Sequence, residues 1–185
     1  RFQNGVNGVG RPLPEVLARR NMQWYEMAST NTADIVTTMN PDRRLFFAKF
    51  DEPTFINQRL IGLKKKSGYT EVSLYHALLN SILGMFYIEA VGFGRGLGAL
   101  DISSTTIRNA FMLNPELLSN ENKNAILEAF EPLLDRQVEH TSVELTLEDR
   151  RNFDITVLRA YGIEEHYESI KQSLLSMQKM RFCVQ

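Results

Sequence analysis

The chain has 185 residues, 43% hydrophobic and 23% charged, which fits one globular domain, or one domain with an appendage, and argues against a disordered, collagen-like or mucin-like chain. One cysteine excludes an internal disulfide and, with only three histidines, a cysteine-rich zinc module; it also fits a reducing, cytoplasmic compartment. The net charge of −1 argues against a nucleic-acid partner, because domains that bind nucleic acids are usually basic.

The N-terminal part of the chain predicts a loop followed by a helix. Residues 4–10 are rich in glycine and asparagine, and no Gly-Lys-Ser/Thr follows them, so they indicate a loop and not a phosphate-binding loop. Residues 14–28 mix apolar and charged side chains as an amphipathic helix does. The chain begins at Arg1 without an initiator Met or a signal pattern, so we expect a piece of a longer polypeptide, with residues 1–33 as a linker from a catalytic domain.

Three runs of β-branched or aromatic residues follow, at 34–39, 44–50 and 55–63. Turn-forming residues at 40–42 and 51–53 separate them, so we expect strands joined by tight turns. The middle run is the most strand-like, and the third could also be helical.

Residues 71–91 form the most apolar stretch of the chain. His76, Asn80 and Glu89 lie inside it and no basic flank orients it, which argues against a membrane span. Small or polar residues recur at helical spacing as far as Gly84, and the other faces are apolar. We therefore expect a helix buried inside the domain, with a stripe of small residues that lets a strand or second helix approach closely.

The segment after this helix predicts a glycine-rich stretch, a short strand and a helical turn. Glycines alternate over 92–98, and a strand is expected at 99–102. Ser103 or Ser104 is the expected cap of a helical turn that reaches Phe111.

The last third of the chain predicts helices at 121–131, 147–161 and 165–181. Thr146 with Asp149 matches a capping box, and Gly162 predicts a helix stop. The last two helices are expected to form an antiparallel hairpin. The predicted fold is α+β, with a small mixed or antiparallel sheet, a buried central helix and this hairpin, divided into a recognition core at 34–113 and a helical region at 114–185.

No catalytic constellation is visible in the sequence. The three histidines share no ligand spacing with each other or with Cys183, and His76 is best explained as a satisfied core residue. The glycine-rich residues 94–98 follow a helix and not a strand, which argues against a dinucleotide-binding loop. We therefore expect no catalytic residue, no metal site and no cofactor within this chain.

Positive charge gathers in the first part of the chain. Residues 1–113 carry 13 Lys and Arg against 9 Asp and Glu, whereas residues 114–185 carry 8 against 13. Lys and Arg neutralise phosphates, and Asn and Arg read base edges. By composition alone, however, a solvated turn is the simpler interpretation of 64–66. Candidate nucleic-acid contacts in the strand region are Arg43, Arg44, Lys49, Asn57, Arg59, Lys64, Lys65 and Lys66.

Three segments follow one another in an order that is typical of one protein family. Residues 75–84 (YHALLNSILG) contain a Leu-Asn-Ser helix motif, and residues 94–102 (GRGLGALDI) contain a glycine-rich motif. Residues 150–163, from RRNFDITVL to Tyr-Gly-Ile, and then Arg181 match a closing pair of helices. Over roughly residues 34–181, the chain resembles the C-terminal target-recognition, or specificity, domains of adenine-specific DNA methyltransferases of bacterial restriction–modification systems.

The resemblance implies a domain that binds double-stranded DNA and helps to select the methylation site. A separate catalytic methyltransferase domain, in the same chain or a partner chain, would hold S-adenosylmethionine and flip the adenine. The family's Asn-Pro-Pro-aromatic motif does not occur in this sequence, so the chain alone is expected to be inactive. Arg95, among glycines that permit close approach to a phosphate, and Arg108 become further candidates. Asn80 is expected to bond backbone.

Two other interpretations remain open: a helical protein–protein adaptor whose basic residues are incidental, and a less favoured self-sufficient enzyme. The placement of the basic groups distinguishes the first from a DNA-binding domain. If they line one concave face, DNA binding is favoured, and if they scatter, the adaptor is favoured. We expect the basic front to contact DNA, the acidic C-terminal helices to pack on the catalytic domain or a partner, and no membrane to be involved.

Overall fold

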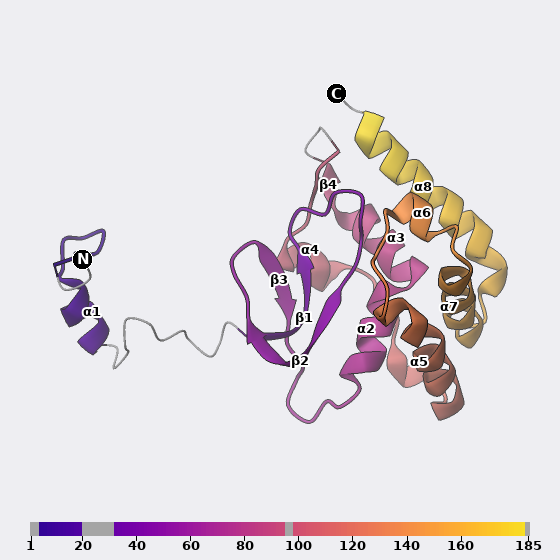
Figure 1. Cartoon of the computed structure of the whole chain (residues 1–185), viewed down its shortest axis with the longest axis horizontal. Coiled ribbons are helices and arrows are strands. Elements are labelled where there is room, and N and C mark those ends of the chain that lie inside the picture. The colour runs from indigo at the N-terminus through magenta and orange to yellow at the C-terminus, as the bar shows by residue number, and fades with distance from the viewer. Residues whose placement is uncertain (1–3, 20–31, 95–97, 184–185) are drawn as a thin grey trace. The chain divides into compact units, whose positions relative to one another are not determined.

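The structure is a computed structural model that describes residues 4–19, 32–94 and 98–183 (Figure 1). Two units, Arg1–Thr32 and Ala33–Gln185, are distinguished by their internal contacts. The first contains α1 (Leu13–Arg19), so the predicted helix is confirmed over its first part, whereas residues 20–28 lie outside the described residues.

The second unit combines a small sheet with helices, and the α+β prediction is confirmed. Strand β1 (Thr32–Thr38) lies between β2 (Ala48–Phe55) and β3 (Leu60–Leu63), and it pairs with β3 in antiparallel register. Two short strands, β4 (Phe93–Gly94) and β5 (Leu100–Asp101), form an antiparallel pair. The helices are α2 (Val72–Asn80), α3 (Ile82–Val91), α4 (Ser104–Asn109), η2 (Pro115–Leu117), α5 (Asn120–Leu134), α6 (Thr141–Glu144), α7 (Glu148–Ala160), η3 (Glu164–His166) and α8 (Tyr167–Cys183).

Strand β2 lies further along the chain than its sequence predicts. Residues 44–47 are not a strand, and residues 51–53, expected to turn, lie within β2. Pro53 is tolerated there because β2 is an edge strand, where a missing N–H need not remove a ladder hydrogen bond. Leu45 and Phe47 are buried in the core although they belong to no strand. Their burial explains why the segment has the apolar pattern of a strand.

The prediction of a single central helix at 71–91 is wrong in one respect. Two helices, α2 and α3, meet there at a bend of 68°. Ser81 adopts an extended conformation at the break, and its Oγ accepts a hydrogen bond from the Gly84 N–H, capping α3. A Cβ at Gly84 would overlap the carbonyl oxygen of Leu79. The small residue of the stripe therefore lets α2 and α3 approach each other across the bend.

In the described part of the chain, no single helix is long and apolar enough to cross a membrane. Only α2 and α3 taken together meet the criteria of length and composition, across their bend.

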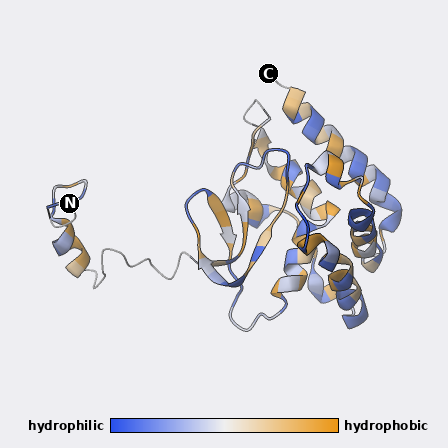
Figure 2. Ribbon diagram, in the orientation of Figure 1, coloured by the Kyte–Doolittle hydropathy of each residue, from blue (hydrophilic) through white to orange (hydrophobic). Residues whose placement is uncertain are grey.

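The helices α5, α7 and α8 lie on the other side of α2 and α3 from the three-stranded sheet (Figure 1). Figure 2 shows that α3 is mainly hydrophobic, whereas α5, α7 and α8 present hydrophobic and hydrophilic residues on different faces. Helix α7 packs chiefly on α5, and α8 packs chiefly on α3, while their mutual contact is smaller than the predicted hairpin implies. The largest fully buried apolar side chains are Phe153, Ile82, Leu100, Ile102, Ile126, Leu145, Leu158 and Leu174.

Local helix signals are confirmed in two of three places. The Ser103 hydroxyl accepts a hydrogen bond from the Thr106 N–H and caps α4, and Gly162 has a φ of +70° just after α7. The capping box at Thr146 and Asp149 is wrong, because Leu147 is the cap residue and no side chain caps the helix. The Thr146 hydroxyl donates to the carbonyl of Val143 instead, and Asp149 binds an arginine.

Candidate functional site

Three of the candidate residues, Lys64, Lys65 and Lys66, lie together at the edge of a cleft of about 390 Å³. We call this the lysine cleft. The three lysines directly follow β3 and are exposed. Its lining residues are Asp34, Ile35, Leu63, Lys64, Lys65, Lys66, Tyr69, Val72, Tyr75 and Glu116. The lining therefore combines three lysines and two acidic residues with apolar and aromatic residues.

The backbone of the lysine run is fixed by Asp34 on β1. The Asp34 carboxylate, through Oδ2, accepts a 2.8 Å hydrogen bond from the Lys65 N–H, and the residue is only 6% exposed. Strands β1 and β3 are antiparallel and Ile35 pairs with Leu63. This register brings Asp34 opposite Lys64, the residue before Lys65. The lysine run thus starts at a defined place on the sheet, and its three residues are exposed.

Two tyrosines form the aromatic part of the cleft. The rings of Tyr69 and Tyr75 are 6.3 Å apart and perpendicular, an edge-to-face arrangement. The Tyr69 hydroxyl is buried, and no hydrogen-bond partner is found for it within the described residues. Burial, with smaller contributions from the negative charges of Glu71 and Glu116, raises the pKa of Tyr69.

Arg43 and Arg44 lie in the loop before β2 and are exposed. The carbonyl of Arg43 accepts hydrogen bonds from the N–H and the hydroxyl of Thr141 in α6, and its guanidinium lies over the ring of Phe182, 5.0 Å from the centroid. These contacts hold Arg43 against α6 and α8, and neither arginine lines the lysine cleft.

Lys49 lines a different cleft, of about 270 Å³, together with His76, Asn80 and Arg136. Its ammonium group is 3.6 Å from the carboxylate of Asp51. His76 is hydrogen-bonded through Nε2 to the Phe47 carbonyl at 2.7 Å, and burial lowers the pKa of this histidine. His76 is thus a satisfied core residue, as the sequence predicts.

Asn57 has a structural role in the turn between β2 and β3. Its side-chain Oδ1 accepts a hydrogen bond from the Arg59 N–H, and its carbonyl accepts one from the Leu60 N–H. This is the local side-chain bonding by which asparagine stabilises turns. Arg59 is exposed, at the opposite end of β3 from the lysines.

The last two candidates lie elsewhere. Arg108 is exposed in the last turn of α4, where a positive charge interacts favourably with the helix dipole. Arg95 lies outside the described residues. The described candidates therefore do not line one common cleft: the lysine cleft holds three of them, the cleft at His76 holds Lys49, and Arg43, Arg44, Asn57, Arg59 and Arg108 line neither.

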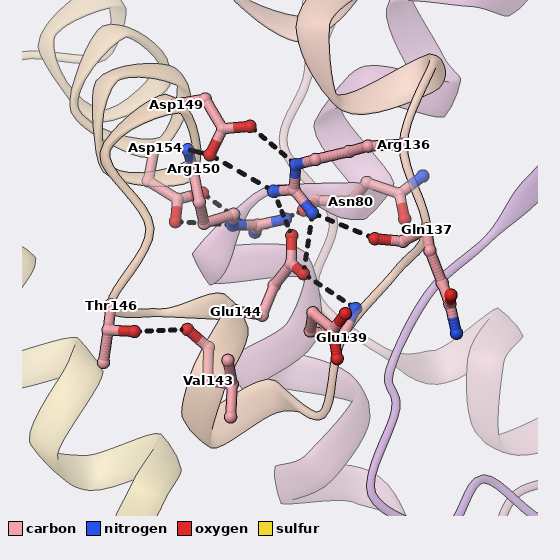
Figure 3. A network of polar contacts seen from close by, with 10 residues as sticks. All are labelled: Asn80, Arg136, Gln137, Glu139, Val143, Glu144, Thr146, Asp149, Arg150 and Asp154. Atoms are coloured by element: carbon pink, nitrogen blue, oxygen red, sulfur yellow. Dashed lines mark hydrogen bonds and ion pairs between the residues drawn. The ribbon is translucent and has the colours of Figure 1, made fainter.

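The residues that carry the family resemblance contact one another in the core. Asn80 accepts from the Phe47 N–H and donates to the Phe47 carbonyl, both at 2.9 Å, so its predicted bonding to backbone is confirmed. Arg150 binds Asp154 through two hydrogen bonds of 2.9 Å and donates to the Asn80 carbonyl at 2.6 Å (Figure 3). Asp154 in turn accepts from the Ile82 N–H. The Arg150–Asp154 pair therefore provides hydrogen-bond partners for backbone groups that lack a partner within the helices, where α2 ends and α3 begins.

Arg181 joins the C-terminal helix to the glycine-rich segment in a similar way. It donates to both carboxylate oxygens of Glu89 and to the carbonyls of Gly98 and Asp42. Both charged side chains are almost fully buried. Gly98 has a φ of +79°, and a Cβ there would overlap the ring of Phe182, so the residue must be glycine for two reasons.

A further ionic network was not predicted from the sequence. Arg136, just after α5, donates to the carboxylates of Glu144 and Asp149 (Figure 3). The hydrogen bond from Arg136 lowers the pKa of Asp149, against the opposing effect of its burial. The network ties α5, α6 and α7 together. Its members lie up to 13 residues apart on a chain that changes direction between them, so no periodic spacing signals it.

Among the described residues, no group of three or more His, Cys, Asp or Glu side chains is arranged to hold a metal ion. No model of a known family, no curated protein sequence and no solved structure matches the chain. The methyltransferase resemblance therefore remains a prediction from the segments quoted above.

Proposed function

We propose that the chain binds DNA through the lysine cleft and is the target-recognition part of an adenine-specific DNA methyltransferase. The observation that carries the proposal is the cleft itself, where three exposed lysines just after β3 adjoin Tyr69 and Tyr75. Lysines bind backbone phosphates, and aromatic side chains stack on bases. The order of the three family-like segments supplies the methyltransferase part of the proposal.

The proposed DNA contact involves fewer residues than the single basic face expected from the sequence. The other basic residues are scattered, and by the criterion of their placement this favours the adaptor alternative. This scatter restricts the proposed contact to Lys64, Lys65 and Lys66, with Arg59 and Arg108 as separate peripheral contacts at most. The catalytic domain that holds S-adenosylmethionine would supply the rest of the DNA surface, and the region 114–185, which is acidic as a whole, would face that domain or another partner.

The proposal is tested by titrating a labelled duplex with the 185-residue chain at several salt concentrations. The triple substitution of Lys64, Lys65 and Lys66 by Ala should weaken binding at least tenfold at low salt. It should also reduce the magnitude of the log–log salt slope by about 2 to 3, because each phosphate contact contributes about 0.9.

A charge-matched control comes from the exposed residues Arg151, Arg159 and Lys179 of α7 and α8. Their replacement by Ala removes the same charge and should leave duplex affinity within about twofold. Equal losses in the two triple variants would contradict the proposed site, and no duplex binding at any salt concentration would contradict DNA binding by the chain.

The adaptor is the second candidate, favoured by the dispersion above and by exposed apolar side chains. Phe93, Phe111 and Leu117 are each more than 70% exposed. The rings of Phe111 and Tyr87 lie 5.9 Å apart, centroid to centroid. If the adaptor is correct, substituting Phe111 by Ser should abolish partner binding and leave duplex titrations unchanged, whereas the lysine substitutions should affect neither.

A further inference from the structure

The lysine cleft differs from a flat phosphate-binding surface in being concave and partly apolar. Its volume of about 390 Å³ lies in the range of small-ligand sites. Ile35, Leu63 and Val72 contribute apolar lining. A duplex held only by its phosphates needs no such recess, so the recess points to a group that enters it.

Asp34 places an acceptor in this recess. Its carboxylate is bonded through Oδ2 to the Lys65 N–H, and that is its one partner among the described residues for which a bond is found. No hydrogen bond to its Oδ1 atom is found among the described residues, and Asp34 lines the cleft. A carboxylate accepts readily from the exocyclic amino group of a base, such as N4 of cytosine, whereas thymine presents a carbonyl oxygen at the same position.

The tyrosines provide a surface for the ring of a base. Tyr69 and Tyr75 line the cleft, and their edge-to-face contact holds them in a defined relative orientation. Base stacking on an aromatic side chain is tolerant of sequence, so the tyrosines would supply affinity and Asp34 would supply selectivity.

We infer that the lysine cleft binds one unpaired nucleotide of DNA, with its phosphate at Lys64–Lys66, its base against Tyr69 and its exocyclic amino group at Asp34. The inference rests on the proposed function and deepens it. It assigns the recess a ligand, a single unstacked amino-bearing base, that duplex binding by phosphate contacts does not require.

The direct test compares short single strands of oligo(dC) and oligo(dT), which differ at the position that Asp34 reads. The 185-residue chain should bind oligo(dC) about 5- to 20-fold more tightly, the discrimination expected of one specific base contact. Equal affinities, or a preference for oligo(dT), would overturn the inference.

The substitution Asp34→Asn sharpens this test. An Asn side chain keeps an oxygen that can accept from the Lys65 N–H, but it replaces the other carboxylate oxygen with a donor. The preference for oligo(dC) should disappear or reverse, and a preference that persists in D34N would overturn the inference. The thermal unfolding midpoint of D34N establishes that the variant is folded.

A second pair of variants covers the case in which D34N does not fold. Tyr69→Phe retains the ring and should bind oligo(dC) like the parent chain, whereas Tyr69→Leu should bind at least fivefold more weakly. Equal binding by these two variants would overturn the inference. Duplex titrations keep the two proposals apart: duplex binding that depends on the three lysines, without preference between the single strands, rejects the nucleotide site and retains the proposed function.

Discussion

Two groups of positive side chains in this molecule differ in what surrounds them. Arg150 and Arg181 are buried, and each binds a buried carboxylate and at least one backbone carbonyl. Lys64, Lys65 and Lys66 extend from the end of a strand to the edge of an open cleft. The arginines therefore stabilise the core, whereas the lysines line a cleft at the surface.

This difference affects how the family-like segments are interpreted. The Leu-Asn-Ser motif, the glycine-rich segment and the closing helices are joined by the bonds of Arg150 to Asn80 and of Arg181 to Gly98. Their order in the sequence can thus be explained by one shared core. Such segments carry information about the fold, whereas a DNA contact must be sought elsewhere on the surface.

The largest expected effect tests the structural role of Arg150. Arg150→Ala should destabilise the chain by about 3–5 kcal/mol, because Asp154 would remain as a buried charge without its partner and the Asn80 carbonyl would lose its donor. Its neighbour Arg151 is 56% exposed, and Arg151→Ala should cost less than about 1 kcal/mol. Urea unfolding of both variants measures the comparison, and similar losses would contradict it.

A smaller effect is expected at the helix break. Asn80→Leu should destabilise the chain by about 2–3 kcal/mol, because the buried Phe47 N–H would lose its acceptor. Asn124 is exposed on α5, and its replacement by Leu provides the control. If N80L unfolds at the same urea concentration as the parent chain, the stabilising role given to the Asn80–Phe47 hydrogen bonds is wrong.

Acidification should destabilise the fold in two stages. The pKa of His76 is lowered by burial, so the unfolded chain takes up a proton first and stability falls as the pH decreases below about 6.5. The pKa of Asp149 is lowered by Arg136, so further stability is lost when this carboxylate is protonated below its unfolded value near 3.8.

The His76 contribution can be isolated by substitution. His76→Gln should flatten the stability change between pH 7 and pH 5 by an amount on the order of 1 kcal/mol, while retaining a donor for the Phe47 carbonyl. The same substitution at the exposed His166 is the control. An unchanged pH profile in H76Q, measured by thermal unfolding, would contradict the assignment.

The smallest expected effect lies in the lysine cleft and has the opposite sign. Tyr69→Phe should stabilise the chain by about 1 kcal/mol, because it removes a buried hydroxyl for which no partner is found among the described residues. A decrease in the unfolding midpoint would show that the hydroxyl is satisfied in solution. A substitution in the lysine cleft would thus raise the free energy of unfolding, whereas the substitution of Arg150 in the core would lower it.

The sequence was informative where structure depends on neighbouring residues. Ser103 caps α4 and Gly162 follows α7 as expected, because each needs only its own backbone and the next turn. The capping box failed because α7 has Leu147 and not Thr146 as its cap residue, and Asp149 binds Arg136 from outside the helix. The break at Ser81 was missed because its backbone groups are satisfied by Asp154 and Arg150, about 70 residues away.

The candidate site shows the same limit. The sequence identified the three lysines but gave no signal that Asp34 and Tyr75 lie beside them, since this depends on the β1–β3 register and on the position of α2. It assigned base reading to Asn57, whose side-chain oxygen instead bonds within its own turn. Local composition thus predicted charge, and tertiary structure determined which charges share a cleft.

The most direct test of the contrast between lysine cleft and arginine core is the change in backbone amide chemical shifts when duplex DNA is added. We expect the largest changes at Ile35, Lys64–Lys66 and Tyr69, with little change at Arg150, Asp154 and Arg181. The largest changes on α7 and α8, or none at the lysine cleft under conditions where DNA binds, would contradict the account.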